Sequence, residues 1–135
     1  MIRFENVSFL YGSATEGGAG VRGIDLEIPE ANVWCSGGVS GCGKTTLTRL
    51  INGLIPHYYE GALSGCVLVD GRNVSAEPLY DTAAIVGSVF QNPRSQFFNV
   101  DTTSEVTFGP ENLGWPEERI RERLAKTVQD FIWKR

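Results

Sequence analysis

The most informative segment of the sequence reads Gly37-Gly38-Val39-Ser40-Gly41-Cys42-Gly43-Lys44-Thr45-Thr46. From Gly38 to Thr45 it matches the phosphate-binding pattern G-x-x-x-x-G-K-[ST]. Glycines let such a loop turn tightly and direct its N–H groups inward, which makes an anion site at a helix N-terminus. The pattern predicts that Lys44 reaches the β- and γ-phosphates of a nucleotide and that the Thr45 hydroxyl takes one Mg²⁺ position.

The residues on either side of this loop have the composition that the pattern requires. Val33-Trp34-Cys35 is a short apolar run, typical of a buried parallel strand. Apolar residues then recur at helical spacing from Thr45 to Asn52, and Gly53 can end that helix. Strand, glycine-rich turn and helix in this order favour a phosphate loop over the alternative, a turn that matches the pattern by chance.

Length and charge exclude several classes of protein. The chain has 135 residues, one domain's worth, with a net charge of −4 and a sequence pI of about 5.0, which argues against a general nucleic-acid-binding surface. No apolar run approaches the roughly 20 residues needed to cross a bilayer, and Met1 to Glu5 has no leader-like character. The cysteines Cys35, Cys42 and Cys66 lack metal-ligand spacing, which fits a reduced, cytoplasmic setting.

Two segments ahead of the loop alternate between apolar and polar residues. Ile2 to Phe9 and Val21 to Ile28 are therefore expected to be antiparallel strands. The run from Cys66 to Gly71 predicts a further strand and a turn. Asp70 in this run resembles the carboxylate of an Mg²⁺-binding strand, but the order Asp-Gly-Arg-Asn from position 70 favours a hairpin turn instead.

The second half of the chain predicts one more strand and mostly helices. Ile85 to Phe90 is expected to be a buried strand that delivers Gln91, either a metal- or water-positioning residue or a plain polar residue that ends the strand. Helices are expected at 78–84, at 103–112 with an interruption at Gly109-Pro110, and from Pro116 to the end. The last helix carries an apolar stripe that is expected to pack in the core: Ile120, Leu124, Val128, Phe131 and Ile132.

Together these segments resemble the ATP-binding subunit of an ABC transporter, from Ile2 to about Ala125. Tyr11 matches the aromatic position that stacks on adenine in that family, Gly38 to Thr46 match its Walker A motif, and Gln91 matches its Q-loop glutamine. The resemblance implies ATP and Mg²⁺ as cofactors, with Lys44 and Gln91 in catalytic roles and Thr45 and Gln91 at the metal. The implied nucleotide contacts are Tyr11, Gly38, Ser40, Gly41, Cys42, Gly43, Lys44, Thr45 and Thr46.

A narrower resemblance is to the energy-coupling-factor and cobalt-importer ATPases. It rests on Asn52 to Pro56, on Gln91-Asn92-Pro93 with Gln96-Phe97-Phe98, and on Glu105-Val106 with Phe108 to Asn112. This resemblance implies three partners, namely a second ATPase subunit, a transmembrane coupling protein and a substrate-binding membrane component, and no nucleic acid. It also implies import of a vitamin or a transition-metal ion, at the inner face of the cell membrane.

Three motifs of the family are missing from the sequence. There is no LSGGQ-type signature, no Walker B strand ending in Asp-Glu and no switch histidine, and Lys126 to Arg135 fit the family poorly. The chain therefore resembles roughly the first half of the domain, as an early stop, a shifted reading frame or trimming would leave it. Such a part is expected to expose an unpaired sheet edge and apolar surface.

The expected fold class is α/β. A P-loop NTPase core of parallel strands with helices accompanies an N-terminal antiparallel β-subdomain, and the domain is truncated before the signature and Walker B motifs. The expected division places the β-subdomain at about 1–32 and 64–74, the P-loop core at 33–53 and 84–92, and the start of a helical subdomain at 100–135.

The sequence thus predicts a partial importer ATPase subunit that binds ATP weakly and hydrolyses almost none alone, because the general-base carboxylate is missing. Two alternatives remain open: a non-catalytic nucleotide-binding relic and, less in keeping with the two leading strands, a small P-loop kinase. Cys42 is expected to be a small residue at a variable position, and the alternative is an oxidisable thiol at the helix N-terminus.

Overall fold

The computed structural model describes residues 1–12 and 18–131. Over these residues the chain forms two compact units, Met1–Ser88 and Val89–Arg135. None of the helices in these ranges is long and apolar enough to traverse a bilayer.

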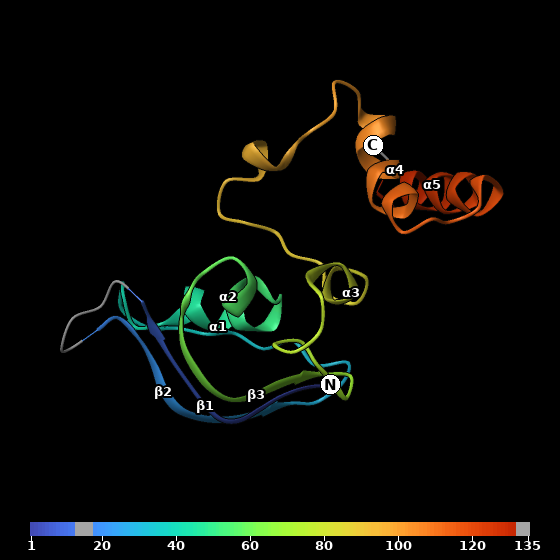
Figure 1. Ribbon diagram of the computed structural model, residues 1–135. Helices are drawn as coiled ribbons and strands as arrows, with labels where there is room; N and C mark the ends of the chain where they lie inside the picture. Colours follow the sequence, from blue (N-terminus) through green and yellow to red (C-terminus); the bar gives the residue numbers. More distant parts are fainter. Residues whose placement is uncertain (13–17, 132–135) are drawn as a thin grey trace. The chain divides into compact units, whose positions relative to one another are not determined.

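An antiparallel sheet, with four strands in the described ranges, forms the base of the first unit (Figure 1). The strands are β1 (Ile2–Tyr11), β2 (Gly20–Ile28), β3 (Gly61–Val69) and β4 (Arg72–Asn73), in the order β2-β1-β3-β4. The two strands predicted ahead of the loop are confirmed, and so is the hairpin turn at Asp70, which joins β3 to β4. β3 begins earlier than predicted, because its first residues pair with the end of β1, Gly61 with Tyr11.

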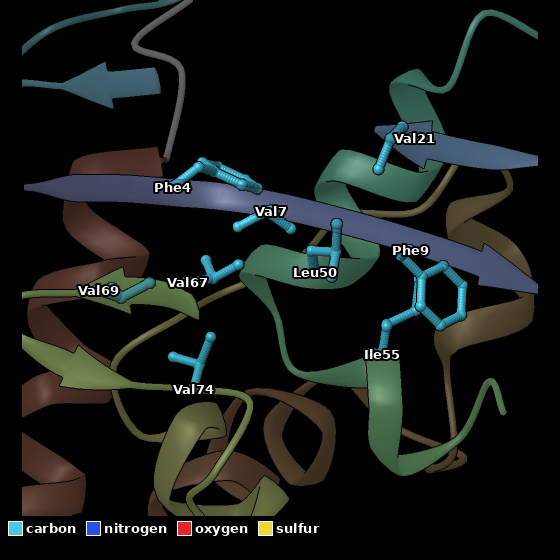
Figure 2. Packing of buried hydrophobic residues seen from close by; sticks show 9 residues of the cluster. All are labelled: Phe4, Val7, Phe9, Val21, Leu50, Ile55, Val67, Val69 and Val74. Carbon is cyan, nitrogen blue, oxygen red and sulfur yellow. The ribbon is translucent and has the colours of Figure 1, made fainter. Parts of the chain in front are cut away.

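Among the described residues of the first unit there are three helices: α1 (Lys44–Ile51), α2 (Leu54–His57) and α3 (Leu79–Ala83). α1 contacts β2 and β3, and Figure 1 shows α1 and α2 above the curved face of the sheet. Figure 2 shows Leu50 of α1 and Ile55 of α2 pointing toward the side chains of β1. Complete burial of a side chain such as Leu50 stabilises a fold by roughly 1.5–3 kcal/mol, so this residue anchors α1 to the sheet. The buried cluster consists of Phe4, Val7, Phe9, Val21, Leu50, Ile55, Val67, Val69 and Val74.

One level of the sheet departs from regular pairing. The registers of β1 with both neighbours shift near its middle, where Asn6 has φ +45°. Opposite it, Gly65 has φ +78°, and a Cβ at Gly65 would lie 2.4 Å from the Asn6 carbonyl oxygen. On the other side, the Asn6 N–H donates to Asp25 Oδ1 at 2.7 Å and the Gly23 N–H donates to Ser8 Oγ at 2.8 Å. Irregularities of this kind bend a sheet, and the strands curve beneath the helices in Figure 1.

The second unit contains the 3₁₀ turn η1 (Pro93–Gln96) and the helices α4 (Thr102–Asn112) and α5 (Glu117–Phe131). Asp101 caps α4, because its carboxylate accepts the Ser104 hydroxyl at 2.6 Å and the Ser104 N–H at 2.9 Å. These hydrogen bonds hold the pKa of Asp101 below its ordinary value. Glu105 accepts the backbone N–H groups of Asn99 at 2.9 Å and Phe98 at 3.0 Å, and these bonds likewise lower its pKa.

The predicted strands at 33–35 and 85–90 are wrong. Neither segment pairs with a strand in the described part of the chain, and Val33 and Val89 are 99% and 87% exposed. A segment becomes a strand only when a neighbour takes up its N–H and C=O groups, and no such neighbour lies beside these two segments among the described residues. Of their apolar side chains, Val86 does pack against the buried cluster.

Two features of the helices also differ from prediction. α4 is not interrupted at Gly109-Pro110 but runs to Asn112, and the Leu113 N–H still bonds to the Gly109 carbonyl at 3.1 Å. The apolar stripe of α5 is not core packing throughout. Ile120 is buried, whereas Val128 and Phe131 are 44% and 81% exposed, because no described element covers the last turns of the helix; Ile132 lies outside the described residues.

Candidate nucleotide-binding site

Glycine backbone conformations shape the loop that leads into α1. Gly41 and Gly43 have φ of +84° and +98°, in the left-handed region, and Gly43 is the N-cap of α1. A side chain in that region costs roughly 1–2 kcal/mol, and a Cβ at Gly43 would also lie 2.8 Å from Val21 Cγ1. The first N–H groups of a helix have no partner within the helix and favour an anion, so the loop presents donors suited to phosphate.

The Lys44 side chain folds back over this loop. Its ammonium donates to the carbonyl oxygens of Gly38 at 2.8 Å and Val39 at 2.9 Å, and to Cys42 Sγ at 3.4 Å. These acceptors are uncharged, so they position the ammonium without neutralising it. Lys44 therefore adds a positive charge to a loop whose N–H groups already favour anions.

The two threonines after Lys44 lie in different surroundings. Thr45 is exposed, whereas Thr46 is 6% exposed and its hydroxyl lies 3.3 Å from the Tyr11 hydroxyl. Thr45 can therefore offer its hydroxyl to a metal. The Thr46 side chain faces the sheet, which leaves its backbone N–H as the group suited to a phosphate.

Tyr11, at the end of β1, belongs to a cluster of aromatic rings beside α1. Its ring meets Phe9 edge-on at a centroid distance of 4.8 Å and Tyr59 edge-on at 6.2 Å. Its hydroxyl accepts a hydrogen bond from Arg49 Nη1 at 3.0 Å. The predicted adenine-stacking residue, on β1, therefore contacts α1, the helix that begins with Lys44.

The sequence patterns did not indicate Arg49 and Tyr59 as residues of the site. The Arg49 guanidinium carbon lies 3.9 Å from the centroid of the Tyr59 ring, while its Nη1 contacts Tyr11. One signal was present in the sequence, because Arg49 follows Thr46 by one helical turn and so shares its face of α1. Nothing in the pattern indicated that Tyr59 would reach the same place.

Gln91 falls in the second unit, where its side chain is exposed. The phosphate loop lies in the first unit, and the role expected for Gln91 stays a prediction. The Asp70 carboxylate, in the turn between β3 and β4, pairs with the Met1 ammonium. That ion pair raises the pKa of the Met1 amine through the hydrogen bond to Asp70.

The surroundings of the loop suit Mg²⁺ carried by a nucleotide. Among the described residues, no three of His, Cys, Asp or Glu lie close enough to hold a metal ion. Mg²⁺ in proteins commonly takes few side-chain ligands and completes its shell with water and substrate phosphates. The exposed Thr45 hydroxyl, next to Lys44 at the start of α1, fits that chemistry.

Comparison with known proteins gives a consistent result. The sequence pattern of a family described as ABC transporter matches residues 21–135. A putative ABC transporter ATP-binding protein of Treponema denticola is 48% identical over 131 residues, or 97% of this chain and 26% of that protein. Similarly named proteins of Pyrococcus horikoshii and Methanosarcina acetivorans are 41% and 37% identical over 92% and 96% of this chain. The matches cover 43% and 21% of those two proteins, so the chain spans less than half the length of each of these relatives.

Proposed function

Because the chain belongs to the family of ABC transporter ATP-binding proteins, we propose that it binds ATP with Mg²⁺ through its phosphate loop and forms the nucleotide-holding part of a transport ATPase. The fold class is that of the N-terminal part of such an ATPase, with an antiparallel sheet and helices, and the 135 residues cover only part of the domain.

The observation that carries this proposal is the position of the Lys44 ammonium. It is held over the phosphate loop by the carbonyl oxygens of Gly38 and Val39, at the N-terminus of α1. Charge-assisted hydrogen bonds from an ammonium and from helix N–H groups are the interactions that recognise a polyphosphate.

Each residue of the site has a distinct part in this binding. The N–H groups of Gly41 to Thr46 and the Lys44 ammonium hold the β- and γ-phosphates, and the Thr45 hydroxyl contributes one ligand to Mg²⁺. Tyr11 offers its ring to the adenine, as stacking on an aromatic side chain does for bases generally. Bound Mg²⁺ would neutralise phosphate charge. Gln91 is proposed to approach the metal and the attacking water in an assembly that includes more of the family's domain.

The kind of transport is a further step of the proposal. The segments around Asn52, Gln91 and Glu105 resemble importer ATPases of the energy-coupling-factor and cobalt type. We therefore propose that a second ATPase subunit, a transmembrane coupling protein and a substrate-binding membrane protein are its partners, at the inner face of the cell membrane. The cargo would be a vitamin or a transition-metal ion.

The test of ATP binding uses one lysine substitution and a matched control. A fluorescent ATP analogue is titrated with the chain in the presence of Mg²⁺, for the unsubstituted protein, Lys44→Ala and Lys126→Ala. Lys126 is an exposed lysine of α5, in the second unit. Loss of a hydrogen bond from a charged group, roughly 1.5–3 kcal/mol, predicts about a tenfold or greater weakening for Lys44→Ala and no change for Lys126→Ala.

Equal affinity of the unsubstituted protein and Lys44→Ala would overturn the proposed binding mode. Phosphate release is measured in the same samples. We expect none above background, because the sequence lacks the family's general-base carboxylate. Turnover that depends on Lys44 would show that this chain is itself a working ATPase.

A further inference from the structure

We propose that Arg49 and Tyr59 are positioning residues that hold the Tyr11 ring for the base of the nucleotide, without contacting its phosphates. This inference rests on the proposed ATP binding, with Tyr11 as the stacking residue. It assigns the pair a share in the affinity for the base, separate from the affinity that Lys44 and the loop provide for the polyphosphate.

One guanidinium serves both aromatic residues. Arg49 Nη1 donates to the Tyr11 hydroxyl at 3.0 Å, and the guanidinium carbon lies 3.9 Å from the centroid of the Tyr59 ring. A planar guanidinium can do both at once, since its N–H groups point outward in its plane while its face rests on the ring. An ammonium at the same place has no such face.

The alternative anchor for a half-buried arginine is a carboxylate, and the described residues offer none to Arg49. In the ranges 1–12 and 18–131, no Asp or Glu oxygen lies within ion-pair distance of its guanidinium. The side chain is therefore held by Tyr11 and Tyr59. In turn, it restrains the two rings that it contacts.

Tyr11 is held at its hydroxyl and by the two aromatic rings that pack against its own ring. Its hydroxyl lies between Arg49 Nη1 and the Thr46 hydroxyl, at 3.0 Å and 3.3 Å. Phe9 and Tyr59 meet its ring edge-on. Two partners for one hydroxyl set the orientation of the ring, and a ring that is already oriented loses less conformational freedom when a base stacks on it.

The geometry also ties the base site to the phosphate loop. Arg49 and Thr46 both lie on α1, whose first residue is Lys44. A base placed by the Tyr11 ring and phosphates placed by Lys44 are thus aligned by one short helix. Loss of Arg49 should loosen the ring while the loop at the start of the helix keeps its shape.

The experiment compares two ligands that share phosphates and differ in the base. Binding of Mg-ATP and of magnesium tripolyphosphate to the full chain is measured by calorimetry, for the unsubstituted protein, Arg49→Gln, Arg49→Lys and Tyr59→Leu. Arg119→Gln is the matched control, because it removes a comparable pair in the second unit, where the Arg119 guanidinium carbon lies 4.0 Å from the Trp115 ring centroid.

We expect Arg49→Gln and Tyr59→Leu to weaken ATP binding by about five- to tenfold, the range of a cation–π contact with its hydrogen bond, and to leave tripolyphosphate binding unchanged. Arg49→Lys should bind ATP with intermediate affinity, and Arg119→Gln should bind both ligands like the unsubstituted protein. Thermal unfolding would show whether Arg49→Gln folds. If it does not, Arg49→Lys takes its place, and the inference then requires that this variant bind ATP more weakly than the unsubstituted protein and tripolyphosphate equally well.

Three results would overturn the inference. An equal loss for both ligands would show that Arg49 only stabilises the fold, and no loss for either would show that it does not act on the base at all; in both cases the proposed ATP binding stands. If the unsubstituted protein binds neither ligand, the proposed function fails and the role of Arg49 fails with it.

Discussion

Gly43 is the residue on which the shape of the phosphate loop depends most. It combines φ +98° with a neighbour, Val21 Cγ1, that would lie 2.8 Å from any added Cβ. The left-handed conformation alone disfavours a side chain, and β2 leaves no space for one. The loop and the sheet are thus in contact at the point where α1 begins.

Gly43→Ala is expected to destabilise the first unit and weaken phosphate binding. Left-handed backbone strain and overpacking against Val21 together predict a loss of roughly 2 kcal/mol or more in the free energy of unfolding, measured by urea denaturation. Gly37→Ala is the matched control, because a Cβ at Gly37 would meet nothing within 4 Å. Equal stability of the two variants would show that the loop adapts to a side chain at position 43.

At the scale of elements, two carboxylates at the start of α4 accept hydrogen bonds, Asp101 at the N-cap and Glu105 in the first turn. Asp101 accepts from Ser104, and Glu105 accepts from Asn99 and Phe98. Both pKa values are lowered, because the bonds favour the charged carboxylates. A carboxyl group whose pKa is lower in the folded state binds protons more readily in the unfolded state, so its stabilising contribution is present above the ordinary pKa and is lost on acidification.

We expect the start of α4 to loosen as the pH falls below about 4.5, the ordinary value for Glu105, toward its lower folded pKa. The backbone amide of Asn99 reports this directly, because it donates to Glu105 Oε2 at 2.9 Å. Its NMR chemical shift should show an acid transition that disappears in Glu105→Gln and persists in Glu118→Gln, a control at an exposed carboxylate of α5. The same transition in Glu105→Gln would assign it to another group.

Elements governed by local sequence were predictable, and those governed by distant neighbours were not. Alternation placed β1 and β2, helical spacing placed α1, and the Asp-Gly turn placed the hairpin at Asp70. Residues 33–35 and 85–90 have strand-like composition, but a strand also needs a hydrogen-bonded neighbour, which sequence composition does not reveal. The described part of the chain provides none for either segment.

The candidate site divides in the same way. The motif predicts a phosphate site at the loop and Lys44, because the chemistry of phosphate binding requires those residue types at fixed spacing. Arg49 lies on α1 and Tyr59 lies between α2 and β3, so they meet only in the folded chain and no local pattern indicates their contact. The proposed role of Gln91 remains a prediction, since the residue belongs to the other unit.

At the scale of the whole molecule, the two units differ in how much they bury. All nine residues of the buried cluster lie in the first unit. In the second unit, Thr107 and Ile120 are the buried residues among those described, and Phe98 and Phe108 stack with 79% and 42% of their surface exposed. Apolar burial is the main source of folding stability, so we expect the second unit to be much less stable than the first.

Hydrogen exchange should therefore separate the two units. Amides of β1 and β3 are expected to be protected about a hundredfold more strongly than those of α4 and α5, the ratio that roughly 3 kcal/mol of opening free energy produces. Exchange measured by mass spectrometry on peptides from 2–11, 61–69, 102–112 and 117–131 tests this. Uniform protection across all four peptides would mean that the exposed apolar side chains of the second unit are covered in solution, and dilution would then reveal self-association.

The bent level of the sheet has a consequence for how the strands find one another. The alternating residues of β1 would allow more than one alignment with β3, because shifting a strand by two residues keeps the same faces inward. At this level, however, the left-handed Asn6 must meet Gly65, and its N–H must meet Asp25. A β1 strand shifted by two residues would lose both of these contacts. The irregular residues therefore favour a single register of β1 with its neighbouring strands beneath α1.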